Sequence, residues 1–232
     1  MITRYTRRFP ELAARLKRQN AGEPYRQLVI LMRERLRATR RNENNGYARA
    51  AELLEDLRHI AIALREQSAG MIVGGELHDV IRLVEGFGFE FVKLDIREHS
   101  RRHGQALDEV FRATRVEERY LELSEEDRQA LLIREINNPR PLVPLDLDTL
   151  PETARQVVET FRMVRWLKHH GYPDALESYI ISGTDAPSDM LEVLLLMKET
   201  RLAADGGRDA QLRIAPLFEE GETLAASRET MQ

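Results

Sequence analysis

Residues 91–97 read Phe91-Val92-Lys93-Leu94-Asp95-Ile96-Arg97, a β-favouring run in which apolar and charged side chains alternate. Such alternation predicts a β-strand. Two further short runs resemble it, Ser-Tyr-Ile-Ile-Ser at 178–182 and Leu-Arg-Ile-Ala-Pro-Leu-Phe at 212–218. Helical periodicity separates the three runs, at about 105–116, 125–135, 151–169 and 188–202. Trp166 and the leucines of 191–196 are expected in the core. Strands that alternate with helices pair in parallel through right-handed crossovers.

The residues before this stretch predict helices only. Periodic apolar positions indicate one helix that opens at Phe9-Pro10-Glu11 and others at about 23–39, 48–67 and 77–85, with a break at Gly74-Gly75. A (β/α)₈ barrel needs eight strands and about 250 residues, so three strands form only part of one. We therefore expect an α/β fold of high helix content: an all-helical segment over residues 1–88 and a partial (β/α) barrel of about three parallel strands over residues 89–232.

Composition narrows the class of protein. The 232 residues are 42% hydrophobic and 32% charged and include no cysteine, which excludes disulfides and thiolate metal sites. No purely apolar run, such as that of residues 193–197, is longer than five residues, whereas a membrane span needs about 20. The N-terminus lacks the apolar core of a secretory signal. We expect a cytoplasmic protein without a membrane partner.

Charge is unevenly distributed along the chain. Residues 1–41 hold 12 Lys and Arg against 3 Glu, although the whole chain has a net charge of −4. The basic residues of this segment interleave with Leu28, Ile30, Leu31 and Leu36 at helical spacing. That pattern is typical of the solvent-exposed face of an amphipathic helix. Because the segment contains no nucleic-acid-binding module, no nucleic-acid partner is expected.

Ionisable side chains stand at the ends of the predicted strands, where the functional groups of α/β folds gather. Arg97 ends the first strand, and Glu219 follows the third. An arginine binds a phosphate or carboxylate through two hydrogen bonds, and a lone carboxylate suits Mg²⁺. Together they outline a site for a phosphorylated, metal-bound anion. In the structural alternative, Arg97 pairs with a helix carboxylate, and Glu219 with Glu220 begins a solvent-exposed turn.

Several separated motifs resemble segments of the phosphoenolpyruvate carboxylase family. Residues 94–97, followed by Ser100 and His103, are similar to its Leu-Asp-Ile-Arg-Gln-Glu-Ser-x-x-His segment. Residues 179–182 with 186–189 resemble its Tyr-Ile-Ile-Ser and Pro-Ser-Asp-x-Leu stretch, and residues 215–219 resemble its Pro-Leu-Phe-Glu-Thr strand. Weaker matches are Glu23-Pro24-Tyr25-Arg26, Leu132-Ile133-Arg134-Glu135 and Arg140-Pro141-Leu142. The matches follow the order of the family over about residues 15–228.

The resemblance implies an activity and a larger enzyme. Members of this family are carboxy-lyases that convert phosphoenolpyruvate and bicarbonate into oxaloacetate and inorganic phosphate with Mg²⁺ or Mn²⁺. This carbon dioxide fixation feeds the tricarboxylic acid cycle. The family's enzymes are homo-oligomeric, are much longer than this chain, and fold as a TIM-type α/β barrel embedded in helices. The chain would therefore be an internal segment whose partner is the remainder of the enzyme.

The same resemblance assigns roles to three residues. Arg97 aligns with a catalytic, phosphate-binding arginine, and Glu219 aligns with a metal-binding carboxylate. Asp95 shares a strand face with Arg97 and is interpreted as a substrate-side residue that orients it, a plain structural ion pair being the alternative. The family's catalytic histidine and second metal carboxylate have no counterpart here. The chain alone is therefore expected not to turn over phosphoenolpyruvate.

Four residues depart from the family's motifs. Glu98 and His99 stand where Gln and Glu are usual, Gly183 where Met is usual, and Glu220 where Thr is usual. Glu220 either adds negative charge beside the metal or points to solvent. His99 and His103 are four residues apart, so on a helix they would share a face. Without a third ligand, that spacing favours a solvent-exposed face over a zinc site.

Two other functions are compatible with the sequence. One is a helical interaction module or split subunit that works only on a partner chain. The other is a stand-alone metal-dependent α/β enzyme, which needs a second carboxylate within about 5 Å of Glu219.

Overall fold

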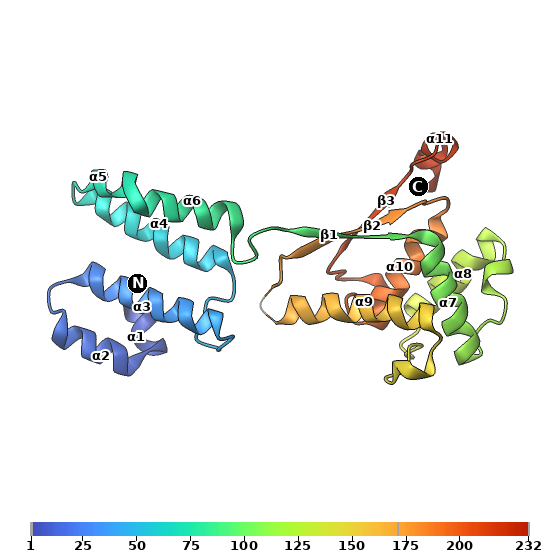
Figure 1. Ribbon diagram of the computed structural model, residues 1–232, viewed down its shortest axis with the longest axis horizontal. Coiled ribbons are helices and arrows are strands. Elements are labelled where there is room, and N and C mark those ends of the chain that lie inside the picture. The colour runs from blue at the N-terminus through green and yellow to red at the C-terminus, as the bar shows by residue number, and fades with distance from the viewer. Residues whose placement is uncertain (1, 171, 232) are drawn as a thin grey trace. The chain divides into compact units, whose positions relative to one another are not determined.

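A computed structural model describes residues 2–170 and 172–231, which form two compact units (Figure 1). Unit 1 holds the described residues of Met1–Val92 and His170–Pro173, and unit 2 those of Lys93–His169 and Asp174–Gln232. No described helix is long and apolar enough to cross a membrane. The domain boundary expected between residues 88 and 89 stays a prediction.

Unit 1 is helical, as the sequence predicts. Its elements are α1 (Ile2–Arg8), α2 (Pro10–Gln19), α3 (Pro24–Arg40), α4 (Ala50–Glu66), α5 (Gly70–Ile72), the π-helical turn η1 (Val73–Leu77) and α6 (His78–Phe87). Proline is the first residue of α2 and of α3. The first backbone N–H groups of a helix have no hydrogen-bond acceptor within it, so proline, which lacks an N–H, is well tolerated there. Gly75 has non-helical dihedral angles between α5 and α6, at the predicted break.

A buried polar cluster fixes the packing of the helices in unit 1. The Arg35 side chain is 1% exposed, and its guanidinium lies 3.9 Å from the centroid of the Tyr47 ring. It pairs with Glu52 and lies 3.5 Å from Oδ2 of Asp56. The Tyr5 and Tyr47 hydroxyls both donate to Asp56. Because loss of one partner would leave a buried charge unpaired, the cluster specifies how these helices meet.

Unit 2 contains a three-stranded parallel sheet in the order β1-β2-β3. Its main elements are β1 (Leu94–His99), α7 (Ser100–Thr114), α8 (Glu125–Asn137), α9 (Glu152–His169), β2 (Leu176–Ser182), α10 (Pro187–Glu199), β3 (Arg213–Leu217) and α11 (Gly221–Thr230). Short 3₁₀ turns lie at η2 (Tyr120–Glu122), η3 (Leu147–Thr149) and η4 (Asp205–Gly207). The expected partial α/β barrel of about three parallel strands is confirmed.

The two faces of the sheet differ in character. Tyr179 and Ile181 of β2 are buried in the core of unit 2, where the Phe161 ring of α9 stacks on Tyr179 at 4.9 Å between centroids. Figure 1 shows α9 and α10 on this side of the strands. Strand alternation places Arg97 on the opposite face, in register with half-buried Ile180. Arg97 and His99, which share this face of β1, are therefore directed away from the core.

Element boundaries differ from the sequence expectation around β1. The strand begins at Leu94 instead of residue 91, because Phe91 has a φ of +64°, which a strand does not accommodate. It continues to His99, so Arg97 lies two residues inside the strand and not at its end. Helix α7 follows at once from Ser100, five residues earlier than predicted. Helices α1 and α11 were not predicted. The expectation that Trp166 lies in the core was wrong, because this residue is 54% exposed.

Candidate functional site

Arg97 and Glu219 meet at the carboxyl end of the sheet. They are 122 positions apart in sequence, yet Nη2 of Arg97 donates a hydrogen bond to Oε1 of Glu219 at 3.3 Å. The two side chains are 59% and 45% exposed. An ion pair this open to solvent adds little to stability, so its value lies in holding both groups where a ligand can reach them.

A pocket of about 300 Å³ surrounds this pair, and we call it the strand-exit pocket. It contains two guanidinium groups and three carboxylates. Its lining residues are Arg97, His99, Arg101, Ser182, Gly183, Asp185, Glu219, Glu220 and Thr223. Because the cationic groups come from β1 and the start of α7 and the carboxylates from the loops after β2 and β3, both charge types face one space. The pocket can therefore bind an anion beside a cation.

Arg101 is a pocket residue that sequence reasoning missed. The helix after β1 was expected to begin near residue 105, which would have left Arg101 in a connecting loop. In the structure α7 begins at Ser100, and the Ser100 hydroxyl donates to the carbonyl oxygen of Gly183 at 2.6 Å. This bond ties the start of α7 to the loop after β2, and Arg101 lies on the pocket wall.

Gly183 and His99, both departures from the family's motifs, contact one another. Gly183 has a φ of +62°, and a Cβ built there would lie 2.6 Å from Cε1 of His99. The imidazole of His99 therefore occupies space that any side chain at position 183 would need. In the sequence, both positions differ from the family's motifs, but neither stretch of sequence indicated that the two residues are in contact.

Glu220 begins α11. Its backbone N–H donates to Oγ1 of Thr223 at 3.3 Å, which caps the first turn of the helix. The Glu220 side chain is exposed and lines the strand-exit pocket with Glu219. It thereby adds a negative charge to the pocket.

Asp95 lies on β1 two residues before Arg97 and is exposed. The sheet register is irregular between Leu94 and Ile96, so Asp95 sits at a distortion of the β1–β2 pairing. Among the described residues, its carboxylate has neither a hydrogen bond nor an ion pair. Its proposed role towards the substrate stays a prediction.

His99 and His103 do not form a pair on an exposed helix face, and that expectation was wrong. His99 is the last residue of β1, and its Nδ1 accepts from the backbone N–H of Arg101 at 3.3 Å. His103 lies in α7 with 0% exposure, and its Nε2 lies 2.8 Å from the Tyr179 hydroxyl. The rule for residues four apart fails because only one of the two is helical.

The described residues of this chain do not complete a metal site. The described part of the chain contains no group of three or more His, Asp or Glu side chains placed to hold an ion. Glu219 is a single carboxylate, and its Oε1 already accepts from Arg97. Since Mg²⁺ gives up its water reluctantly, one carboxylate holds it weakly. Further ligands would have to come from outside the residues that the structure describes.

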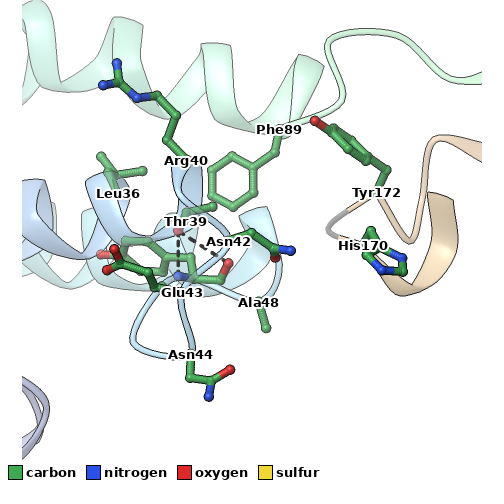
Figure 2. A pocket seen from close by; sticks show the side chains of 12 residues that line it. Leu36, Thr39, Arg40, Asn42, Glu43, Asn44, Ala48, Phe89, His170 and Tyr172 are labelled. Atoms are coloured by element: carbon green, nitrogen blue, oxygen red, sulfur yellow. Dashed lines mark hydrogen bonds between the residues drawn. The ribbon is translucent and has the colours of Figure 1, made fainter. Parts of the chain in front are cut away.

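Unit 1 contains a separate pocket of about 570 Å³ (Figure 2). Leu36, Thr39, Phe89 and the loop around Asn42 contribute to its wall, and Oγ1 of Thr39 accepts from the backbone N–H of Tyr47 at 2.7 Å. Figure 2 shows the polar side chains of Arg40 and Asn44 pointing in different directions rather than towards one point. Polar groups that do not converge do not position a ligand, so the strand-exit pocket is the stronger candidate.

Comparison with known proteins agrees with the motifs. The family profile of phosphoenolpyruvate carboxylase matches residues 1–232. The chain belongs to the phosphoenolpyruvate carboxylase family. Phosphoenolpyruvate carboxylase of Roseiflexus castenholzii is 40% identical over 238 residues, covering 97% of this chain and 25% of the relative. That of Aeromonas hydrophila is 38% identical over 221 residues, covering 90% of this chain and 24% of the relative.

A third relative gives similar proportions. Phosphoenolpyruvate carboxylase of Synechocystis sp. is 36% identical over 233 residues, covering 93% of this chain and 22% of the relative. The chain therefore spans about a quarter of the length of the curated relatives it matches. The resemblance inferred from separated motifs is confirmed, and so is the expectation that the family's enzymes are much longer.

Proposed function

We propose that this chain supplies the phosphate-binding side and one metal-binding carboxylate of a phosphoenolpyruvate carboxylase active site. The observation that carries the proposal is the meeting of Arg97 and Glu219, 122 residues apart, in one solvent-open pocket. The substrates would be phosphoenolpyruvate and bicarbonate, and the products oxaloacetate and phosphate. The partner would be the part of the family's polypeptide that this chain does not span, assembled as a homo-oligomer.

Arg97 has the chemistry that phosphoryl transfer requires. As bicarbonate takes the phosphoryl group from phosphoenolpyruvate, negative charge spreads over the phosphoryl oxygens. A guanidinium can donate two parallel hydrogen bonds to those oxygens. Held beside Glu219 near the carboxyl end of β1, Arg97 is already oriented, so little orientational freedom is lost when the anion binds.

Glu219 would be one ligand of Mg²⁺ or Mn²⁺. It lies two residues after the end of β3, so the strand positions its backbone, and its second oxygen, Oε2, has no hydrogen bond among the described residues. Asp185 and Glu220 line the same pocket and increase its attraction for a cation. The remaining ligands would come from the part of the family's polypeptide that this chain does not span and from the substrate.

A chimera tests the proposal. Residues 1–232 replace the matching segment of the Roseiflexus castenholzii relative, and oxaloacetate is measured with malate dehydrogenase. The chimera is expected to be active, and Arg97→Gln to lower kcat/KM by about 100-fold or more, as loss of a charge-stabilising donor does. Glu219→Gln is expected to raise the Mn²⁺ concentration needed for half-maximal activity. Arg228→Gln, at an exposed arginine of α11, is the matched control.

The chain by itself is expected to produce no oxaloacetate in the same assay, because its metal site is incomplete. Steady production by the isolated chain would contradict this expectation. An active chimera in which Arg97→Gln behaves like Arg228→Gln would contradict the role of Arg97.

A further inference from the structure

The strand-exit pocket contains two hydrogen-bond donors that the proposed function does not use. They are the guanidinium of Arg101, in the first turn of α7, and the imidazole of His99, the last residue of β1. Arg97 and His99 are two residues apart on one strand, so their side chains lie on the same face of the sheet. The two unused donors therefore stand beside the residue proposed to bind phosphate.

The imidazole of His99 is held in one orientation. Its Nδ1 accepts from the backbone N–H of Arg101 at 3.3 Å, which caps the first turn of α7. In a neutral imidazole one ring nitrogen accepts and the other donates, so this bond places the proton on Nε2. Nε2 has no hydrogen-bond partner among the described residues. His99 therefore offers the pocket a positioned N–H donor.

Gly183 makes this orientation of the ring possible. A Cβ built on Gly183 would lie 2.6 Å from Cε1 of His99 and 2.8 Å from its Nε2. A side chain at position 183, such as the methionine usual in the family's motif, would therefore displace the ring. The glutamate usual at position 99 would place a negative charge where this chain places an N–H. The donor thus depends on two residues in which this chain departs from the family's motifs.

Arg101 is the guanidinium of the pocket that remains available to a ligand. Arg97 already donates to Glu219 at 3.3 Å. Arg101 is exposed and forms no ion pair among the described residues. The Ser100 hydroxyl, which donates to the carbonyl oxygen of Gly183 at 2.6 Å, fixes the backbone from which Arg101 extends. A guanidinium can donate two parallel hydrogen bonds to the two oxygens of a carboxylate.

The charges of the pocket favour a carboxylate over a second phosphate. Three carboxylates line the pocket against two guanidinium groups. A second doubly charged anion would be repelled by this negative excess at short range. A carboxylate has a single charge, and its two oxygens lie in one plane, as the donors of a guanidinium do. Arg101 and the Nε2–H of His99 can therefore bind one such group together.

We propose that Arg101 and His99 form a carboxylate-binding subsite of the strand-exit pocket, next to the phosphate-binding Arg97. The group bound is planar and carries one negative charge. Both the carboxylate of phosphoenolpyruvate and bicarbonate have this chemistry. The proposal rests on the proposed function, because it adds a second anionic group to the same pocket. It is tested separately, since neither Arg101 nor His99 takes part in binding the phosphate.

Ligand-observed ³¹P NMR on the chain tests the subsite with two probes. Phosphonoacetate carries a phosphonate and a carboxylate, whereas methylphosphonate carries only the phosphonate. Phosphonoacetate is expected to bind at least about tenfold more tightly, because its carboxylate gains hydrogen bonds to a charged group. Broadening of the ligand signal measures both affinities and does not require a monomeric chain.

Variants separate the two anion positions. Arg101→Gln is expected to remove the tenfold advantage of phosphonoacetate and to leave methylphosphonate binding within about twofold of the wild type. Arg101→Lys keeps the charge without the two parallel donors and is expected to regain part of the advantage. His99→Ala is expected to weaken phosphonoacetate binding about threefold or more. Arg97→Gln is expected to weaken the binding of both probes. Arg228→Gln, at an exposed arginine outside the pocket, is the matched control.

The chimera distinguishes the two sources of the carboxylate. If the subsite binds the carboxylate of phosphoenolpyruvate, Arg101→Gln is expected to raise the KM for phosphoenolpyruvate about tenfold. If it binds bicarbonate, the same variant raises the KM for bicarbonate instead. In both cases kcat is expected to change less than KM, because the lost hydrogen bonds are present before and during the reaction.

Two results would overturn the proposal. One is equal binding of phosphonoacetate and methylphosphonate by the wild-type chain. The other is an active chimera in which Arg101→Gln leaves both KM values unchanged. In either case the role of Arg97 stands as long as Arg97→Gln lowers the activity of the chimera. Failure of the proposed function itself is a different result, which removes the subsite as well: Arg97→Gln would then leave both probe affinities and the activity of the chimera unchanged.

Discussion

Gly183 has a left-handed backbone conformation, with φ at +62°, and lies against the ring of His99. Two separate penalties therefore oppose a side chain at this position. The positive φ disfavours any residue other than glycine, and the imidazole blocks the space. Only the second penalty depends on His99, so the two can be measured apart.

Gly183→Ala is expected to destabilise unit 2 by about 2 kcal/mol or more in urea unfolding. In the double variant Gly183→Ala with His99→Ala, the steric clash is absent because the imidazole ring has been removed. The double variant is therefore expected to be destabilised only by the unfavourable backbone conformation, by about 1 kcal/mol. Gly221→Ala, whose Cβ would meet nothing within 4 Å, is the control. Equal stability of the single and double variants would show that the ring contributes nothing.

His103 illustrates how burial sets protonation at the scale of one residue. Burial, and then the charges of Arg102 and His99, lower the pKa of His103 from 6.5 to about 4. Its Nδ1 has no partner among the described residues, so protonation in the folded state would leave a buried N–H unpaired. The neutral ring is therefore the form that the fold accommodates.

The pH dependence follows from that shift. Between about pH 6.5 and pH 4 the unfolded chain binds the proton at residue 103 and the folded chain does not, so stability falls as the pH falls. The contribution of this residue has a slope of about 1.4 kcal/mol per pH unit. Urea unfolding at several pH values is expected to show this slope in the wild type and to lose that part of it in His103→Gln. A parallel pH profile for the variant would contradict the assignment.

At the scale of elements, the N-terminus of α10 is capped by a residue of another helix. Glu125, the first residue of α8, accepts from the backbone N–H of Ser188 at 2.9 Å and from its hydroxyl at 2.7 Å. The first N–H groups of a helix have no partner within it. A carboxylate there satisfies one of them and interacts favourably with the helix dipole. One side chain thus joins α8 to α10.

Glu125→Ala is expected to lower the free energy of unfolding of unit 2 by about 1–3 kcal/mol, because the buried Ser188 loses its partner. Glu126→Ala changes the neighbouring exposed carboxylate of the same helix and is expected to stay within about 0.5 kcal/mol of the wild type. Urea unfolding followed by circular dichroism measures both. Equal losses in the two variants would mean that the contact between α8 and α10 is energetically neutral.

At the scale of the whole molecule, the sheet is open at both sides. In the described part of the chain, β1 and β3 each pair only with β2, so their outer backbone groups lack strand partners. Parallel sheets are normally covered and continued on both sides. The relatives are about four times as long as this chain, which leaves ample polypeptide to cover these edges in the complete enzyme.

The isolated chain is therefore expected to self-associate through its exposed strand edges. Sedimentation velocity is expected to show a weight-average mass that rises above the 26.8 kDa of the monomer as concentration increases. A single monomeric species with sharp cooperative unfolding would contradict this expectation. The chimera described above is the natural control, because its sheet is continued by the rest of the enzyme.

The sequence alone determined the family, the three strands and the pairing of Arg97 with Glu219 at one end of the sheet. These features follow from local alternation and from one general rule, that parallel strands present their carboxyl ends at the same edge. Each of the motifs that indicate these features is a continuous stretch of sequence, so it can be recognised without coordinates. The boundaries of β1 were less accurate, because the positive φ of Phe91 and the immediate start of α7 have no clear sequence signal.

Only the tertiary structure decided the burial of His103, the contact of Gly183 with His99 and the unpaired oxygen of Glu192. Glu192 lies in a leucine-rich helix that the sequence assigns to the core. A charged residue is unusual in such a helix, but the sequence did not indicate which residues surround it. Burial and contact depend on which surfaces of distant elements meet. That outcome is set by the packing of α7, α8 and α10 together, and no single stretch of sequence encodes it.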